Sequence, residues 1–229
     1  MLLAELEVWH SRPYAPTRRV ALGHLVLPAD PAPGFGGVLL GAVVAANVEA
    51  VTDDNEADLH RLILQVERAE RVVQPRLRHR FQVDRHGLAH SVHRLVGEGE
   101  NLTFEFERHG SPLQQVLGAI YATERLAVPS RHGVAAALLK GLRWRGPIGP
   151  ELIAHLAGPS ASFNSLLDPK AWAFEVLGFP QGTAEAAKKE VMAKYRDRLR
   201  EVHPDHGGDQ TTASQAIVEL SEARRILLA

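Results

Sequence analysis

The chain has 229 residues, 45% of them hydrophobic, and its 26 basic and 27 acidic side chains leave a formal net charge of −1. That length suits one large domain or two small ones with a substantial apolar core, and the balanced charge argues against a generally basic nucleic-acid coat protein. The complete absence of cysteine excludes disulfides, thiol catalysis and cysteine-ligated metal sites, and it favours a reducing, cytoplasmic setting.

The first fifty residues predict strands and one buried apolar segment. The N-terminus has no basic start and reaches an acid at Glu5, so we expect no secretory signal. Strands are predicted at 3–9 and 20–27. The apolar run 38–48 is about half the roughly 20 residues that a membrane-spanning helix needs, so it predicts a buried helix or strand in a soluble protein with no membrane partner.

Residues 56–106 change from a helical to a strand period. Apolar side chains at helical spacing predict a helix over 56–73. After Pro75, a period-two stretch begins at Phe81, a mixed pattern follows over 88–96, and a second period-two stretch covers 102–106, with Gly-containing turns between them. Such stretches predict an antiparallel β-meander.

Three more helices are predicted before a change of domain. They cover 112–126, 133–144 and 150–156. Small, polar and Pro residues then cluster over 158–170, a composition typical of a linker. The sequence therefore predicts an α+β protein, with a mixed α/β domain over 1–157, a linker at 158–170 and a separate domain over 171–229.

The histidines and arginines of the first domain are its candidate chemistry. His79, His86, His90 and His93 invite a metal interpretation, but Gly87 favours a hairpin over the helix that a four-residue spacing requires. We favour a polar strand face and predict no metal, no cofactor and no enzymatic activity, although an unrecognised active site stays an alternative.

A local excess of arginine between Arg71 and Arg94 is the second candidate. It could form a surface for a partner protein or for nucleic-acid phosphates, although acidic residues before it could neutralise it and only Phe81 could stack on bases. Nucleic acid is therefore the less favoured partner, and a nucleic-acid-associated adaptor that uses this arginine surface stays an alternative function. The candidate residues of this surface are Arg76, Arg78, Arg80, Arg85 and Arg94.

The last sixty residues predict a pair of helices. A short AFEVLGF segment precedes a helix for which Thr183 is a suitable N-cap, and Val191, Tyr195, Leu199 and Val202 form its apolar stripe. His203-Pro204-Asp205 ends that helix, and a last helix follows over 214–228. Two antiparallel helices with a short polar loop form a helical hairpin, whose apolar face the AFEVLGF segment can close.

In these residues the chain closely resembles the J-domain family, the co-chaperones of DnaK-type heat-shock ATPases. The resemblance covers about 171–229, and its four segments occur in order: AFEVLG, Tyr195-Arg196, His203-Pro204-Asp205 and LSEARRIL. It implies an all-α J-domain hairpin that docks on the chaperone and stimulates its ATPase. The excess of Arg over Lys, with abundant Ala, Leu and Val, suggests a bacterial source.

The resemblance also implies which residues contact the chaperone. His203, Pro204 and Asp205 would form the essential triplet, and Arg196 is the best-matched basic contact. The supporting cations would be Lys188, Lys189, Lys194 and Arg200.

Several features separate the chain from the general members of the family. Arg198 stands where the family usually has an apolar core residue, and we expect Leu199 to replace that contact. Glu201 stands at a position that is often basic in the family. Arg224 stands where the last helix frequently has a Tyr. A J-like domain that no longer stimulates a chaperone is therefore an alternative. Without cysteine there is no zinc-binding region, and the sequence ends with the last helix, so we expect a specialised co-chaperone that recognises its client through residues 1–157.

Overall fold

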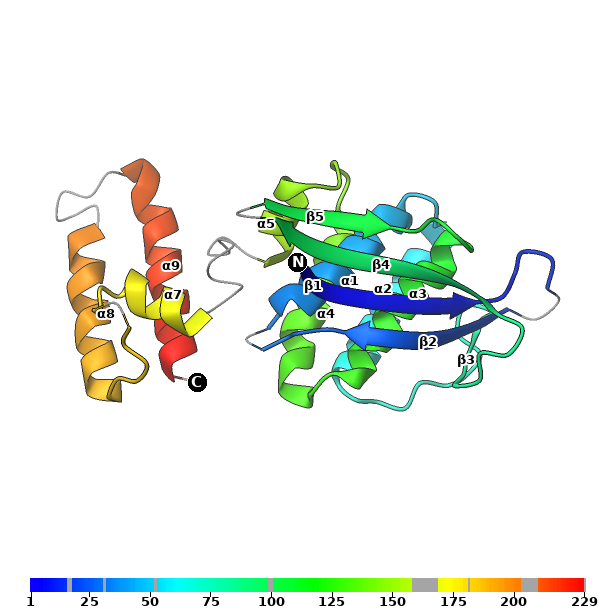
Figure 1. The fold of residues 1–229 in the computed structure, drawn as a ribbon, viewed down its shortest axis with the longest axis horizontal. Coiled ribbons are helices and arrows are strands. Elements are labelled where there is room, and N and C mark those ends of the chain that lie inside the picture. Colours follow the sequence, from blue (N-terminus) through cyan, green and yellow to red (C-terminus); the bar gives the residue numbers. More distant parts are fainter. Residues whose placement is uncertain are drawn as a thin grey trace. The chain divides into compact units, whose positions relative to one another are not determined.

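The computed structural model separates into two units, Met1–Ala157 and Gly158–Ala229 (Figure 1). It describes residues 1–15, 18–30, 32–51, 53–98, 101–157, 169–180, 182–202 and 210–228. The chain is of mixed α+β class, as the sequence predicts, because the first unit combines a five-stranded sheet with helices and the described part of the second is helical.

Alternating apolar residues form the central strands of the sheet. In β1 (Leu2–His10) Leu6, Val8 and His10 are buried and the residues between them are half-buried, so one face of the strand meets the core. The strand order is β3-β2-β1-β4-β5. The other strands are β2 (Arg19–Val26), β3 (Arg80–Phe81), β4 (Ala89–Glu98) and β5 (Asn101–Phe106).

The predicted meander is correct for β4 and β5 and wrong for the segment before them. β4 and β5 pair in antiparallel fashion, but β3 is two residues long and lies parallel to β2 at the far edge of the sheet. The reason is that β1 pairs along nearly the whole of β4 and occupies the edge that a meander would give to β3. A contact between residues this distant in sequence has no local signal.

The helices of the first unit lie on one side of the sheet (Figure 1). The apolar run becomes α1 (Gly34–Val48), which contacts β1 and β4 as well as three other helices and is buried on nearly every side, as expected of a helix without a polar face. No helix in the described part of the chain is long and apolar enough to cross a membrane. The remaining elements are α2 (Asp53–Glu67), α3 (Pro112–Ala122), the 3-10 turn Thr123–Arg125, α4 (Val128–Arg143) and α5 (Pro150–Ala157).

Helices α1 and α4 approach each other through glycines. A Cβ atom on Gly141 would lie 2.3 Å from the carbonyl oxygen of Gly41, and one on Gly41 would lie 2.9 Å from the carbonyl oxygen of Ala137. The two backbones are therefore in direct contact, and neither position has room for a side chain.

The helix predicted over 56–73 ends earlier, at Glu67. Ala69 adopts a left-handed conformation with φ of +53°, its N–H donates to Val66 O, and Glu70 N–H donates to Gln65 O. These bonds form a Schellman cap. Glycine usually occupies the left-handed position of this cap, and Ala69 also fits the apolar stripe, so the sequence did not predict the end.

A buried polar network joins the sheet to α3. His10, Ser91, His93 and Gln115 are each at most 2% exposed. Ser91 Oγ donates to His109 O, which leaves it to accept from Nε2 of His10 at 3.0 Å. Nε2 of His93 donates to Oε1 of Gln115 at 2.9 Å. Both imidazoles therefore carry a hydrogen on Nε2, from which they donate.

The second unit consists, in its described part, of α7 (Pro169–Val176), α8 (Lys188–Val202) and α9 (Gln210–Leu228). The predicted N-cap at Thr183 is wrong, because α8 begins at Lys188. The Thr183 hydroxyl instead donates to Pro180 O at 2.7 Å and so stabilises the turn before the helix.

Candidate docking surface of the C-terminal unit

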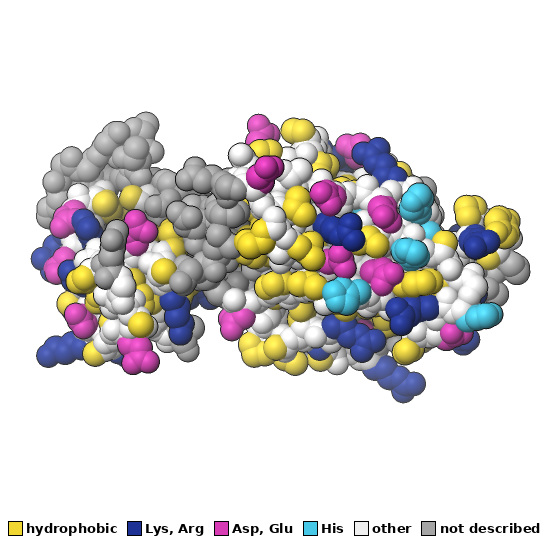
Figure 2. Space-filling view, viewed as in Figure 1, with side chains coloured by type: hydrophobic (Ala, Val, Ile, Leu, Met, Phe, Trp, Pro, Cys, Tyr) yellow, Lys and Arg dark blue, Asp and Glu magenta, His cyan; other side chains and the backbone are white. Residues whose placement is uncertain are grey.

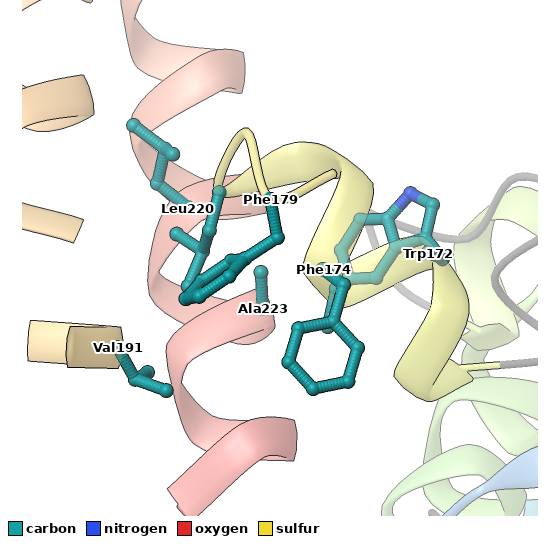
Figure 3. Packing of buried hydrophobic residues seen from close by; sticks show 8 residues of the cluster. Trp172, Phe174, Phe179, Val191, Leu220 and Ala223 are labelled. Atoms are coloured by element: carbon teal, nitrogen blue, oxygen red, sulfur yellow. The ribbon is translucent and has the colours of Figure 1, made fainter. Parts of the chain in front are cut away.

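An apolar cluster holds the three helices of the second unit together (Figure 3). Phe174 from α7 meets Phe179 edge-on with ring centroids 5.3 Å apart, a favourable aromatic geometry. Val191 contributes from α8, and Leu220 and Ala223 contribute from α9. α8 and α9 pack side by side and run in opposite directions (Figure 1). The cluster therefore fixes which face of α8 points inward.

The turn after α7 is a Schellman cap of the usual kind. Gly178 has φ of +72° and its N–H donates to Glu175 O, while Phe179 N–H donates to Phe174 O, both at 2.9 Å. This conformation favours glycine. The cap directs Phe179 back into the cluster, and it exposes the Gly178 carbonyl to α8.

Two cations of α8 bind this turn. Lys194 Nζ donates to Gly178 O at 3.1 Å and lies 5.7 Å from the centroid of the Phe179 ring. The Arg198 guanidinium covers Gly178 so closely that a Cβ there would lie 2.6 Å from Nη2, and Nη1 also pairs with Glu201 at 2.9 Å. Lys194, a predicted chaperone contact, therefore has a structural contact within its own unit.

The other predicted cations of α8 face solvent. Lys189, Arg196 and Arg200 are all exposed, and their spacings of seven and four residues place them on one face of the helix, opposite the buried Val191. Arg196 Nε bonds Met192 O of the same helix, and Arg200 lies 3.4 Å from Asp197. Lys188 is exposed in the first turn. α8 thus presents three cations together.

The predicted triplet His203, Pro204 and Asp205 lies outside the described residues. α8 ends at Val202, immediately before it. The end of the basic helix and the start of the triplet are therefore adjacent in the chain.

Arg224 has a partner that the sequence did not predict. Its guanidinium lies 4.5 Å from the centroid of the Tyr195 ring, within the range of a cation–π contact. Ser221 Oγ donates to Ile217 O at 2.8 Å, so the Tyr195 hydroxyl donates to Ser221 across 3.4 Å. In the sequence, the three-residue spacing of Ser221 and Arg224 indicates that both side chains lie on one face of a helix and can reach the same neighbour.

The predicted arginine surface of the first unit is spread over different elements. Arg76 bonds Gln65 at 2.7 Å, and Arg85 lies 5.4 Å over the Trp9 ring. Arg94 pairs with Glu5 at 2.7 Å, and this hydrogen bond is the main reason why the pKa of Glu5 is lowered. Arg78 and Arg80 are exposed. In Figure 2 the visible face of this unit mixes basic, acidic and histidine side chains.

The four candidate histidines have separate surroundings. His79 Nδ1 donates to Leu77 O, and His90 lies against Trp9 with the two rings tilted. His93 bonds Gln115, and His86 is exposed. Burial lowers the pKa of both His79 and His93. In the described part of the chain, no group of three or more His, Asp or Glu side chains is placed to hold a metal ion.

Comparisons of the chain with protein-family models, with curated proteins and with solved structures gave no match. The assignment of a function therefore depends on the residues and contacts of this chain.

Proposed function

We propose that the chain is a co-chaperone whose C-terminal unit is a J-domain. In this proposal α8 and α9 form the J-domain hairpin, α7 closes its apolar face, and the unit docks on a DnaK-type chaperone and stimulates its ATPase. The N-terminal unit selects the client or the location. The protein itself catalyses no reaction.

The observation that carries the proposal is the position of three cations on the helix that leads into the triplet. Lys189, Arg196 and Arg200 share the solvent face of α8, and that helix ends one residue before His203. Exposed cations on one face steer an encounter with an acidic partner surface, and their effect falls as salt rises.

The triplet supplies the second half of the contact. A carboxylate such as Asp205 can form a charge-assisted pair with a partner arginine. Pro204 restricts the backbone beside it, which reduces the entropy lost when the loop is ordered on binding. A basic helix face therefore supports encounter, and the triplet supports specific docking.

The positions of the cations on α8 agree with this role. Lys194 and Arg198 bind the Gly178 turn and so help to hold α8 against the turn that follows α7. The polar contacts of Arg196 and Arg200 stay within α8. Docking on a partner can then occur without loss of the contacts that stabilise the unit.

The test is single-turnover ATP hydrolysis by a DnaK-type chaperone from the same organism, with and without the full-length chain. We expect the chain to accelerate hydrolysis, and Asp205→Asn or His203→Gln to return the rate to that of the chaperone alone. Asp58→Asn makes the same chemical change at an exposed carboxylate of α2 and should leave stimulation intact. Equal rates with the wild-type chain, with Asp205→Asn and with no added chain would refute the proposal.

A further inference from the structure

Among the residues that the structure describes, the outer edge of β5 pairs with no other strand. β5 is the last strand of the sheet (Figure 1). Glu107 N–H donates to Val92 O, and Gly97 N–H donates to Met1 O. The even-numbered residues of β4 therefore bond toward β5 and the odd-numbered residues bond toward β1, because these directions alternate along a strand.

The pairing of β4 with β5 transfers this alternation to the outer edge. Glu105 and Thr103 lie opposite Arg94 and Val96, so their backbone groups bond to β4. The N–H and C=O groups of Leu102, Phe104 and Phe106 consequently point away from the sheet. These groups form a template for one more antiparallel or parallel strand.

The side chains of the same three residues form an apolar row beside the free edge. Phe106 lies opposite His93 and meets its ring at 5.5 Å, which places it on the helix-covered face of the sheet. Phe104 stacks on Phe106 with centroids 5.4 Å apart. All three side chains are only half-buried, so a neighbouring strand would cover more of their apolar surface.

Within the described residues, β5 itself lacks four features that usually prevent strand addition, and α5 is a helix that contacts the strand. Natural edge strands are blocked by Lys, Pro, bulges or very short length. The sequence of β5, NLTFEF, has neither Lys nor Pro, pairs with β4 without a register shift and is six residues long. The opposite edge, β3, has two residues and is paired in parallel.

We propose that two copies of the chain associate through antiparallel pairing of β5 with β5. Residues directly opposite each other in an antiparallel pair share a face of the sheet, so self-pairing must be centred on a single residue. A centre at Phe104 places Phe104 opposite the second copy's Phe104 and Leu102 opposite the second copy's Phe106. It is the register in which all the outward-pointing groups bond to each other.

Charge selects the same register. With the centre at Phe104, Glu105 lies opposite Thr103 and Glu107 lies opposite Asn101. A centre at Glu105 would place two glutamates directly opposite each other, which is destabilising. A centre at Thr103 would place Phe106 beyond Asn101 of the second copy. The sequence of β5 is thus complementary to itself in one register, and this complementarity selects a second copy as the occupant.

The first experiment is sedimentation equilibrium of the full-length chain over a range of concentrations. We expect a monomer–dimer equilibrium. Phe104→Ala and Phe104→Pro both remove the ring, but only the proline removes an outward N–H, and no bond to β4 is lost in either. Phe104→Pro should therefore weaken association at least tenfold more than Phe104→Ala. Circular dichroism of both variants shows whether each is folded.

The second experiment tests the register by disulfide cross-linking. Because the chain contains no cysteine, every disulfide must form between introduced cysteines. Opposite residues in a hydrogen-bonded pair have Cα atoms about 5.5 Å apart, within disulfide range, whereas diagonal neighbours are about 7–8 Å apart. On mild oxidation Phe104→Cys should cross-link to itself and Thr103→Cys should not. Leu102→Cys and Phe106→Cys should cross-link when mixed and not alone.

Three outcomes would overturn the inference. They are a monomer at every concentration, a dimer that Phe104→Pro leaves intact, and equal cross-linking of Thr103→Cys and Phe104→Cys. A chain that stays monomeric and binds an extended peptide at this edge also counts as the first outcome and overturns the inference. None of these results depends on chaperone stimulation, so the proposed function and the dimer are tested separately.

Discussion

The two units of the molecule place their polar groups in opposite ways. The first unit buries a network of His10, Ser91, His93 and Gln115 between sheet and helix. The described core of the second unit is entirely apolar, and the cations of α8 lie around it or on the surface. Buried polar groups specify one packing arrangement but make it sensitive to protonation. Exposed charges add little stability and are free for a partner.

The largest difference in stability between the two units is expected when a side chain is added at the contact between α1 and α4. Gly141→Ala should destabilise the first unit by about 3 kcal/mol or more, because the new methyl group meets the Gly41 carbonyl and a helix backbone cannot yield as a flexible side chain can. Urea unfolding followed by circular dichroism measures the change. Two transitions should appear, and only the one that belongs to the first unit should move.

Ala136→Gly is the matched control in the same helix. Ala136 is exposed, so this change should cost only about 0.5–1 kcal/mol through backbone entropy. Helix propensity alone predicts the reverse order, with Gly141→Ala stabilising by about 1 kcal/mol. A stabilised Gly141→Ala variant would mean that α1 and α4 are not in contact.

The elements of the fold were predictable where their signal is local. The alternation in β1 determines a strand by its period of two, whereas the continuous apolar run of α1 predicted a buried element and left helix and strand as alternatives. The failures have non-local or unusual causes. β3 was assigned to the wrong neighbour because β1 takes the edge of β4, and α2 was extended because Ala69 adopts a conformation usual for glycine.

The second-largest effect is expected from pH, and it should act on the first unit. Burial lowers the pKa of His10, His79 and His93 below the ordinary value of 6.5. A lowered pKa in a base means that the unfolded chain binds protons more readily than the folded one. The stability these groups contribute is complete above about pH 6.5 and is lost as the pH falls below that value. Urea midpoints at pH 7.5, 6.5 and 5.5 should therefore fall for the first unit.

His93→Gln tests the origin of this dependence, because glutamine can still donate to Gln115 but does not titrate. The variant should show a shallower decline than the wild-type chain between pH 6.5 and 5.5. His132→Gln serves as control, since the His132 side chain is 86% exposed. If both variants decline as steeply as the wild type, His93 does not contribute to the pH dependence.

The candidate docking surface was predicted less completely than the fold. Spacing identifies Lys189, Arg196 and Arg200 as a set only after the bounds and inward face of α8 are known. Lys194 belongs to the same run of charges, yet it bonds the carbonyl of Gly178, sixteen residues earlier. Charge alone cannot distinguish an exposed cation from one that caps a neighbouring turn, because the difference depends on how the turn after α7 packs against α8.

The smallest expected effect on stability comes from substitutions that compare a structural cation of α8 with an exposed one. Lys194→Met should destabilise the second unit by about 0.5–1 kcal/mol, because it removes a charge-assisted hydrogen bond to Gly178 O and a cation–π contact with Phe179. Lys189→Met removes the same charge from the exposed face and should leave the urea midpoint unchanged.

In the ATPase assay we expect the reverse order, with the larger effect from Lys189→Met and the smaller one from Lys194→Met. Lys189→Met should reduce stimulation severalfold at low salt, and the reduction should diminish as salt rises and screens the encounter. Lys194→Met, assayed well below its unfolding midpoint, should stimulate nearly as well as the wild-type chain. A loss of stimulation in Lys194→Met equal to that in Lys189→Met, with the fold intact, would show that the Lys194 charge also reaches the partner and that α8 does not divide its cations between stability and docking.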